Sequence, residues 1–482
     1  MKQKLIYILL VAFIIQAASC SKERLSPVPT TSISDLTAFD TKERIEGQVR
    51  AIYASGKNAG MFGGRYQIFN EIRGGDFMND RTNVVTGYDI WSYTPSNSST
   101  NSVEAFWSRA YYVINLVNVF IDGMGTKGTG VVGDALSKNY IGEARFMRAL
   151  CYYGLLQFYA RPYADGNGSK PGVPLRLTAN TSAQNYDLAR ATVGEVYTQI
   201  LDDLNFAEQN LPLTNASATL NTTRAHRNTA IALKTRVFLT MQRYADVITE
   251  GNKIVSATAP FTATTGVAHA LQADVTNVFK TPYTTTESIL SMPFASNEQP
   301  GTQNQLGYYY CPAAFNGGNG EYSLLSTGII ANAGWLATDK RKTMLTTSGG
   351  KQYITKFPGA APFIDFAPVI RYAEVLLNLA EAKVRVNNTV DVQALAILNA
   401  IRGRSDATTI FAPVTAGDLL NAIMTERRIE LLGEGFAGTD LTRLLQPLPA
   451  KPGVNSIPST GQQYIWPIPS TELLLNSLMT DN

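Results

Sequence analysis

The chain has 482 residues, with 41 basic and 38 acidic side chains and a formal net charge of +3. Without Lys2 and Lys4, which belong to a predicted signal segment, 39 basic residues face 38 acidic ones. A chain so close to neutral lacks the basic surface of a nucleic-acid-binding protein and the polybasic patch that binds membranes. The low charged fraction of 16% and the 23 tyrosines favour a surface that binds neutral polar ligands.

The first twenty residues have the pattern of a secretory signal. Two lysines come first, residues 5–15 are apolar, and small residues precede Cys20. We interpret residues 1–19 as a signal peptide and residues 20–36 as a lipidated Cys20 with a flexible tether; ordinary secretion with a chance cysteine is the alternative. No later stretch has the roughly 20 consecutive apolar residues of a spanning helix, so the sequence predicts an anchored protein.

Helical periodicity dominates residues 37–256. Apolar side chains recur at helical spacing in four stretches, 103–122, 137–160, 192–210 and 227–256. Ser137 is a candidate N-cap of the second stretch, and Thr192 with Glu195 predicts a capping box at the start of the third. The fourth is predicted to be a helix pair broken near Arg243.

Residues 257–368 lack this periodicity and are rich in Thr, Gly, Asn, Tyr and Pro, which predicts an irregular insert with short strands. Residues 369–482 form a C-terminal helical region, with helices expected at 369–386, 391–402 and 415–433. Thr415 and Asp418 predict a cap for the last of these. One polar stripe runs along the first, through Arg371, Glu374, Asn378, Glu381 and Arg385. Helix pairs of about 34 to 45 residues predict stacked helical hairpins and a mainly α fold.

Few residues offer metal or redox chemistry. The chain has only two histidines, His226 and His269, which we expect to be surface or capping residues, and it has no HExxH motif. The string GMGTKG at 123–128 matches GxGxxG but follows a helix, so it predicts a loop and no dinucleotide site. Cys151 and Cys311 suggest no disulfide framework. We expect no cofactor, no metal and no catalytic residue.

Acidic residues allow two interpretations. Glu71, Asp76 and Asp80 could supply the carboxylate pair of a glycosidase, although any chain with 38 acidic residues offers such pairs. Four glutamates recur in the helical motifs, Glu374, Glu381, Glu426 and Glu430. We favour ion pairs between helices for them over catalysis, with Arg371, Arg385, Arg427 and Arg428 as the expected partners.

Five stretches in order along the chain resemble the SusD/RagB family of nutrient-binding lipoproteins. They are the cysteine-terminated signal followed by SKE, WSRAYYVINLVN at 107–118, EARFMRALCYYGLLQFY at 143–159, the run from RYAEVLLNLAEA at 371–382 through LNAIRGR and ERRIELLGEG to DLTRL, and IWPIPSTELLLN at 465–476. The resemblance covers essentially the whole chain.

The resemblance implies a platform of about four tetratricopeptide-like helix pairs, with loops and the insert carrying the ligand site. It also implies anchoring in the outer membrane at the cell surface, and delivery of a ligand to a TonB-dependent transporter of the SusC type. The family's ligands are mostly oligosaccharides, and peptides in some members. We therefore predict a binding protein and not an enzyme.

Two loop stretches combine aromatic side chains with Asn, Asp, Arg and Gln, as concave sugar sites require. They are residues 76–93 and 303–335. The candidate contacts are Trp91 and Trp335 as stacking platforms, Asp80, Arg81 and Asn83 as hydroxyl partners, and Tyr309 as a mixed contact. The competing interpretation of each aromatic is packing in the core, which we accept for Trp107.

Three other functions remain open at this stage. Helical-hairpin arrays bind partner proteins readily, so the chain could be a docking scaffold without affinity for a small ligand. A peptide-binding member of the same family is a second alternative. A surface glycoside hydrolase is a third, and the release of products would reveal it.

Overall fold

The computed structural model describes residues 37–182, 186–301, 303 and 305–482. The predicted signal peptide, Cys20 and the whole tether lie outside the described residues. In the part of the chain that is described, no helix has the length and apolar character needed to cross a membrane.

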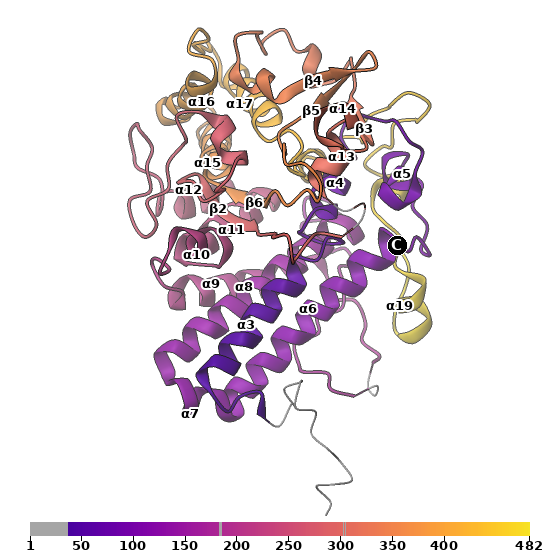
Figure 1. The fold of residues 1–482 in the computed structure, drawn as a ribbon, viewed down its shortest axis with the longest axis vertical. Coiled ribbons are helices and arrows are strands. Elements are labelled where there is room, and N and C mark those ends of the chain that lie inside the picture. The colour runs from indigo at the N-terminus through magenta and orange to yellow at the C-terminus, as the bar shows by residue number, and fades with distance from the viewer. Residues whose placement is uncertain (1–36, 183–185, 302, 304) are drawn as a thin grey trace, which may run out of the picture.

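Helices form most of the regular structure (Figure 1). The longer ones are α3 (Lys42–Gly56), α6 (Val103–Gly123), α8 (Asp134–Tyr159), α9 (Val193–Asn210), α11 (Arg227–Thr240), α12 (Tyr244–Gly251), α15 (Tyr372–Asn387), α16 (Val392–Ser405) and α17 (Ala416–Glu430). The shorter ones are α4 (Arg65–Glu71), α5 (Tyr88–Trp91), α7 (Thr129–Val132), α10 (Ala218–Thr223), α13 (Leu306–Tyr310), α14 (Ala313–Asn316), α18 (Ala437–Arg443) and α19 (Ser470–Leu475).

Long helices that are neighbours along the chain are also neighbours in space. Helix α6 packs on α8, α8 on α9, α9 on α11, α11 on α12, α12 on α15, and α15 on α16 and α17. In Figure 1, α3, α6, α8 and α9 form the lower part of the molecule, and α15 to α17 lie above with the insert. The predicted mainly α fold with a tetratricopeptide-like platform is confirmed.

Local signals set several helix boundaries correctly. Thr192 and Glu195 form the predicted capping box of α9, and the predicted break after α11 falls between Thr240 and Tyr244. Ser137 is not an N-cap, because α8 already begins at Asp134, after Gly133 at φ +78°. Ser137 is therefore the fourth residue of α8, and its hydroxyl lies 2.7 Å from the hydroxyl of Thr129.

The GMGTKG stretch is helical, which corrects the predicted loop. Gly123 ends α6, and residues Met124–Gly128 form a short π-helix that leads into α7. The glycines allow close packing, since a Cβ on Gly123 would lie 2.1 Å from the ring of Phe39. The stretch therefore joins two helices and does not follow a strand, as a dinucleotide loop must.

The strands form three separate antiparallel pairs. They are β1 (Phe77–Asn79) with β3 (Tyr322–Leu324), β2 (Ser288–Met292) with β6 (Ala367–Arg371), and β4 (Leu345–Ser348) with β5 (Lys351–Ile354). The short strands expected in the insert are thus present. The helix predicted from residue 369 begins only at Tyr372, because Val369 and Ile370 extend β6 and are buried against β2.

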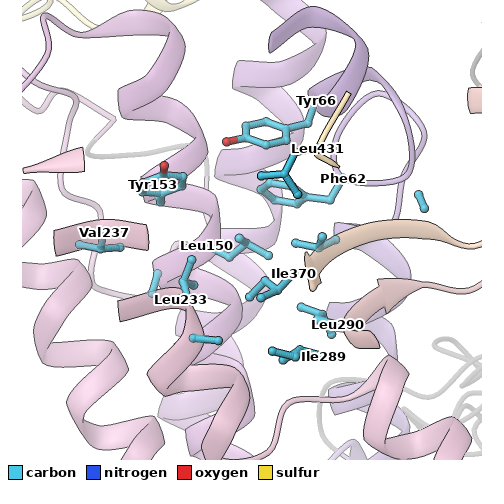
Figure 2. Close-up of a cluster of buried hydrophobic side chains, with 14 of the residues drawn as sticks. Phe62, Tyr66, Leu150, Tyr153, Leu233, Val237, Ile289, Leu290, Ile370 and Leu431 are labelled. Atoms are coloured by element: carbon cyan, nitrogen blue, oxygen red, sulfur yellow. The ribbon is translucent and has the colours of Figure 1, made fainter. Parts of the chain in front are cut away.

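One hydrophobic core joins the platform to the insert. Figure 2 shows Leu150 and Tyr153 of α8, Leu233 and Val237 of α11, Ile289 and Leu290 of β2, Ile370 of β6, and Phe62, Tyr66 and Leu431 in one cluster. The β2–β6 pair therefore seats the insert directly on the helices. Trp107, on α6, is 3% exposed and belongs to this core, as expected.

The polar stripe of α15 is buried and lies between helices. Glu374 accepts hydrogen bonds from Arg236 of α11 at 2.6 Å, and Glu381 accepts from Arg443 of α18 at 2.7 Å. The predicted pair of Glu381 with Arg385 is present, also at 2.7 Å. The ion-pair interpretation of these glutamates is confirmed, with several partners that the sequence did not indicate.

A buried ion network links the insert to the C-terminal helices. Arg371 contacts Glu434 at 2.6 Å and Glu430 at 3.1 Å, and it also pairs with Glu287 at the start of β2. The bases of the network are Arg341, Lys356, Arg371, Arg402 and Arg404, and its acids are Glu287, Asp339, Glu426, Glu430 and Glu434. Two expected partners pair elsewhere, because Arg427 binds Asp440 and Arg428 binds Asp76.

Both histidines are buried. The expectation of surface or capping residues holds for His226 at a helix cap and is corrected for His269, which is neither exposed nor at a cap. Their rings stack with centroids 5.3 Å apart, and His226 occupies the N-cap position of α11. Burial lowers the pKa of His226 to about 3 and that of His269 to about 4, so both rings are neutral at pH 7. Cys151 and Cys311 are free and buried, in keeping with the absence of a disulfide framework.

Candidate functional site

The two loop stretches singled out from the sequence meet at the β1–β3 pair. Phe77 is paired with Leu324 and Asn79 with Tyr322, so residues almost 250 positions apart in the chain lie side by side. This pairing places the loop after β1 beside the insert.

The loop after β1 carries three of the predicted contacts. Asp80 forms an ion pair of 2.6 Å with Lys351 of β5, and Arg81 donates from Nε and Nη2 to the carbonyl of Asn319 at 3.1 and 2.8 Å. Asn83 accepts from the backbone N–H of Val85 at 3.0 Å. Asp80 and Arg81 fix this loop to the insert, and Asn83 bonds within the loop itself.

Trp91 packs inside the protein. Its side chain is 3% exposed, and its indole N–H donates to the carbonyl of Phe77 at 2.8 Å. Tyr88 stacks beside it at 6.0 Å, and the ammonium of Lys451 lies 5.4 Å from its ring centroid. A stacking platform needs an open face, and the ring of Trp91 has none in this structure.

Tyr309 and Trp335 are buried as well, at 0% and 3% exposure. Tyr309 stacks on Tyr322 of β3 with centroids 6.3 Å apart, and burial raises the pKa of its hydroxyl to about 12. Trp335 lies under the ammonium of Lys342, 5.2 Å from the ring. The structure does not bring these rings together with Trp91 around one hollow.

The three carboxylates considered for a glycosidase pair have separate partners. Glu71 is buried and accepts from the backbone N–H groups of Gly435 and Phe436 at 2.9 and 3.2 Å; burial raises its pKa to about 7. Asp76 binds Arg428 at 2.6 Å, and Asp80 binds Lys351. In the described residues, no group of three or more His, Cys, Asp or Glu is placed to hold a metal ion.

A cleft of about 620 Å³ opens where β1 begins. Residues 74–76 and 325–328 form one side of it, and α17, α18 and residues 446–450 form the other. Its aliphatic walls are Leu325, Met424, Leu441, Leu444 and Pro449, and its polar groups include Asp76, Thr327, Asn421, Thr425, Arg428 and Gln446. We call it the α17–α18 cleft. Its volume lies within the roughly 300–1,000 Å³ of small-molecule sites.

Charges in the α17–α18 cleft are already compensated. Arg428 is half exposed and donates to Asp76, and Asp440 accepts from Arg427 at 2.7 Å and from Arg443 at 2.9 Å. The side chains of Asn421 and Gln446 are exposed and make no hydrogen bond within the described residues. The cleft thus offers free amide groups and aliphatic surface with little net charge, which suits a neutral polar ligand.

The sequence did not single out Asn421, Arg428 or Gln446. Arg428 stands in the ERRIELLGEG stretch, where it was assigned to scaffold ion pairs, and Asn421 and Gln446 belong to no motif. Only the packing of α17 against α18 and the insert exposes them to a common space. Asp76 and Thr327 are the polar residues of this cleft that the predicted loop stretches contain.

Comparisons with known proteins agree along the chain. Residues 30–239 match a family model described as "Starch-binding associating with outer membrane", and residues 365–482 match the model of the SusD family. The fold is also that of a crystallised SusD superfamily protein from Bacteroides fragilis, at 31% identity, with a TM-score of 0.82 over 92% of this chain and 100% of that one. The protein belongs to the SusD family.

Other relatives cover the same span. The SusD-like protein P2 of Formosa agariphila is 24% identical over 100% of this chain and 99% of its own length. A structure titled as a laminarin-binding SusD-like protein matches with a TM-score of 0.71 at 19% identity, over 92% of this chain and 99% of that one. The SusD/RagB resemblance found in the sequence is therefore confirmed.

Proposed function

We propose that this SusD-family protein is a carrier that captures carbohydrate at the cell surface, with the α17–α18 cleft as its binding site. One observation carries the proposal: the β1–β3 pairing places both loop stretches beside a concave, nearly neutral cleft. In the cleft, Asn421 and Gln446 would bond sugar hydroxyls while the aliphatic walls contact C–H groups.

Two comparisons support a carbohydrate ligand. The description of the family model for residues 30–239 contains the words starch-binding, and one structural relative is titled as binding laminarin. The cleft itself fits such ligands, since Asp76 neutralises Arg428 and no unpaired charge demands a charged partner. The alternative of a peptide ligand is addressed by the assay below.

The carboxylates support binding without turnover. A glycosidase needs an acid and a base that both face the bond to be cleaved. Glu71 is enclosed by backbone donors, and Asp76 and Asp80 are held in ion pairs with Arg428 and Lys351. We therefore propose a protein that returns its ligand unchanged.

The loop after β1 is proposed as a second contact region. Asp80 and Arg81 hold the loop in place, but Arg81 Nη1 and the side-chain amide N–H groups of Asn83 have no partner within the described residues. These donors are available to a long ligand. Trp91, Tyr309 and Trp335 would act only by packing beneath it.

Anchoring and delivery complete the proposal. Cys20 would carry the lipid that holds the protein on the outer membrane, and the ligand would pass to a TonB-dependent transporter of the SusC type. A Cys20→Ala variant tests the anchor: cell fractionation should move the protein from the outer membrane to a soluble fraction. Co-purification of a membrane transporter with the tagged protein tests the partner.

The binding assay uses the soluble protein begun at Ser21, incubated with a panel of glycans and peptides. Retained ligand and released products are recorded together. Saturable retention of one glycan class without products supports the carrier. Released products would identify an enzyme instead, retention of peptides alone would identify a peptide carrier, and no retention across the panel would favour a docking scaffold.

Matched variants locate the site. Asn421→Ala and Gln446→Ala should each weaken glycan binding about 2- to 10-fold, the loss of one hydrogen bond of about 0.5–1.5 kcal/mol. Asn252→Ala and Gln463→Ala, at exposed positions outside the cleft, are the controls and should bind as the wild type does. Unchanged affinity in both cleft variants would move the site elsewhere.

A further inference from the structure

A second and smaller hollow lies on the insert, away from the α17–α18 cleft. Its volume is about 200 Å³, and it lies between a 3₁₀ turn at Val275–Phe279, helix α14, and the hairpin formed by β4 and β5. We call it the Phe315 pocket. No residue of it lines the larger cleft.

Phe315 differs from the other aromatic side chains of its stretch. Tyr309, Tyr322 and Trp335 are at most 3% exposed, whereas Phe315 is 45% exposed. It stands on α14, a helix of four residues that ends at Gly317 in the left-handed region (φ +81°). An aromatic ring presented to solvent above a pocket provides the flat apolar face that the buried tryptophans do not.

Threonine hydroxyls line the pocket beneath this ring. The hydroxyls of Thr346 and Thr355 make no hydrogen bond within the described residues, so they are free to donate and accept. Thr276 is engaged, since its hydroxyl donates to Asp274 at 2.9 Å and accepts from Lys280 at 3.0 Å. The free hydroxyls are therefore those of Thr346 and Thr355, each of which can both donate and accept. Lys280 also lines the pocket, and its exposed ammonium keeps two N–H groups without a partner in the described residues.

The second lysine of the pocket, Lys356, is fully engaged. The ammonium of Lys356 donates to the carbonyls of Glu430 and Leu432 at 3.0 Å each and to the carboxylate of Glu434 at 2.7 Å. All three of its N–H groups are thus occupied. Phe279 covers this ammonium, with its ring centroid 4.7 Å away.

We propose that the Phe315 pocket binds a single neutral sugar ring, with its C–H face against Phe315 and its hydroxyls bonded to Thr346 and Thr355. The volume is below the roughly 300–1,000 Å³ of drug-sized ligand sites, which fits one ring and not a chain. The inference rests on the proposed carbohydrate function and adds a second site to it. An oligosaccharide held in the α17–α18 cleft would not occupy this pocket.

The test measures the response of the Phe315 ring to simple glycosides. The mature protein, solubilised in detergent and labelled with 4-fluorophenylalanine, is titrated with methyl β-D-glucopyranoside, methyl β-D-galactopyranoside and methyl α-D-mannopyranoside. Fluorine NMR follows the Phe315 signal, which a Phe315→Leu variant assigns. We expect a saturable shift of this signal with at least one glycoside. No shift with any glycoside, or the same shift with cyclohexanol, would overturn the proposal.

Variants separate the pocket from the cleft. Thr346→Val and Thr355→Val keep the shape and remove a hydroxyl, so each should weaken glycoside binding at Phe315 about 2- to 10-fold. Thr347→Val, on the same strand but outside the pocket, should change nothing. Equal affinity in all three variants would overturn the proposal.

The two sites can also fail separately. The panel assay could show oligosaccharide retention that depends on Asn421 while the fluorine signal of Phe315 does not shift with any glycoside. That result would contradict the Phe315 pocket and support the carrier function. If the fluorine signal of Phe315 shifts with glycosides but no oligosaccharide is retained, the result would contradict the carrier function and support sugar binding in the Phe315 pocket.

Discussion

The helical platform and the junction between the insert and the C-terminal helices are held together differently. In the platform, apolar side chains such as Leu150 of α8 and Leu233 of α11 meet across neighbouring helices. At the junction, Arg371 alone pairs with Glu287, Glu430 and Glu434, all at most 2% exposed in their side chains. Apolar contacts tolerate imperfect geometry, whereas each buried ion depends on specific partners.

The difference has a consequence for function. The α17–α18 cleft lies along α17, whose opposite side carries Glu426 and Glu430 of the ion network. The network fixes the position of α17 relative to the insert, and so sets the shape of a cleft formed by both. The platform meets the cleft through contacts of α11 with α18, and buried ions of the network are not among them.

The largest effect is expected at the centre of the network. Arg371→Met leaves three carboxylates buried with one cation fewer, and we expect the free energy of unfolding to fall by about 3–5 kcal/mol. Chemical denaturation measures it. Arg243→Met is the matched control, because Arg243 and Asp246 are both about 40% exposed, and it should cost about 0–1 kcal/mol. Equal losses in the two variants would contradict the account.

A cavity in the platform should cost somewhat less and leave the site intact. Leu150 is fully buried, so Leu150→Ala should lower the free energy of unfolding by about 2–5 kcal/mol. Glycan affinity, measured below the unfolding transition, should remain that of the wild type. A large loss of affinity in the folded variant would show that the platform also shapes the cleft.

The pH dependence of stability should have opposite signs for two buried glutamates. Burial raises the pKa of Glu71 to about 7, so its contribution is fully present below about pH 4.5 and is lost as the pH rises through 7. For Glu381, burial opposes ionisation, but Arg443 and Arg385 outweigh it and lower the pKa to about 2. Its contribution is present above about pH 4.5 and is lost as the pH falls towards 2.

Denaturation curves of Glu71→Gln and Glu381→Gln across pH 3–8 measure these contributions. Glu71→Gln should remove the decline in stability between about pH 4.5 and 7, and Glu381→Gln should remove part of the decline below pH 4.5. A Glu71→Gln variant whose stability still declines in the same window would place the responsible group elsewhere.

The smallest effect is expected at a helix end in the platform. The Thr192 hydroxyl accepts from the backbone N–H of Glu195, so Thr192→Ala should cost about 1 kcal/mol. Thr198→Ala, at an exposed position within α9, is the control and should cost less, because its hydroxyl bonds only the carbonyl of Gly194. Thermal unfolding resolves the difference between the two variants.

Local patterns predicted the platform well for a physical reason. A capping box such as that of Thr192 and Glu195, or of Thr415 and Asp418, lies within four residues, and helical periodicity lies within two turns. Both signals are complete in a short stretch of sequence. By contrast, the predicted helix begins at Val369, although Val369 and Ile370 belong to a strand. Their strand partner, β2, lies about 80 residues earlier in the chain, so no local pattern indicates the pairing.

The candidate site was predictable only in part. Composition located the two loop stretches, and the structure pairs them through β1 and β3. Composition could not distinguish buried from exposed aromatic side chains. Trp91, for example, donates its indole N–H to the carbonyl of Phe77 and packs in the core. Asn421 and Gln446 carry no sequence signal, because their exposure depends on how α17 and α18 pack.

The most direct test of the central claim is a crystal structure of the protein with the glycan that the panel assay retains. The account predicts continuous sugar density in the α17–α18 cleft, within hydrogen-bond distance of Asn421 and Gln446. Sugar density confined to other surfaces, with the cleft occupied only by solvent, would contradict it.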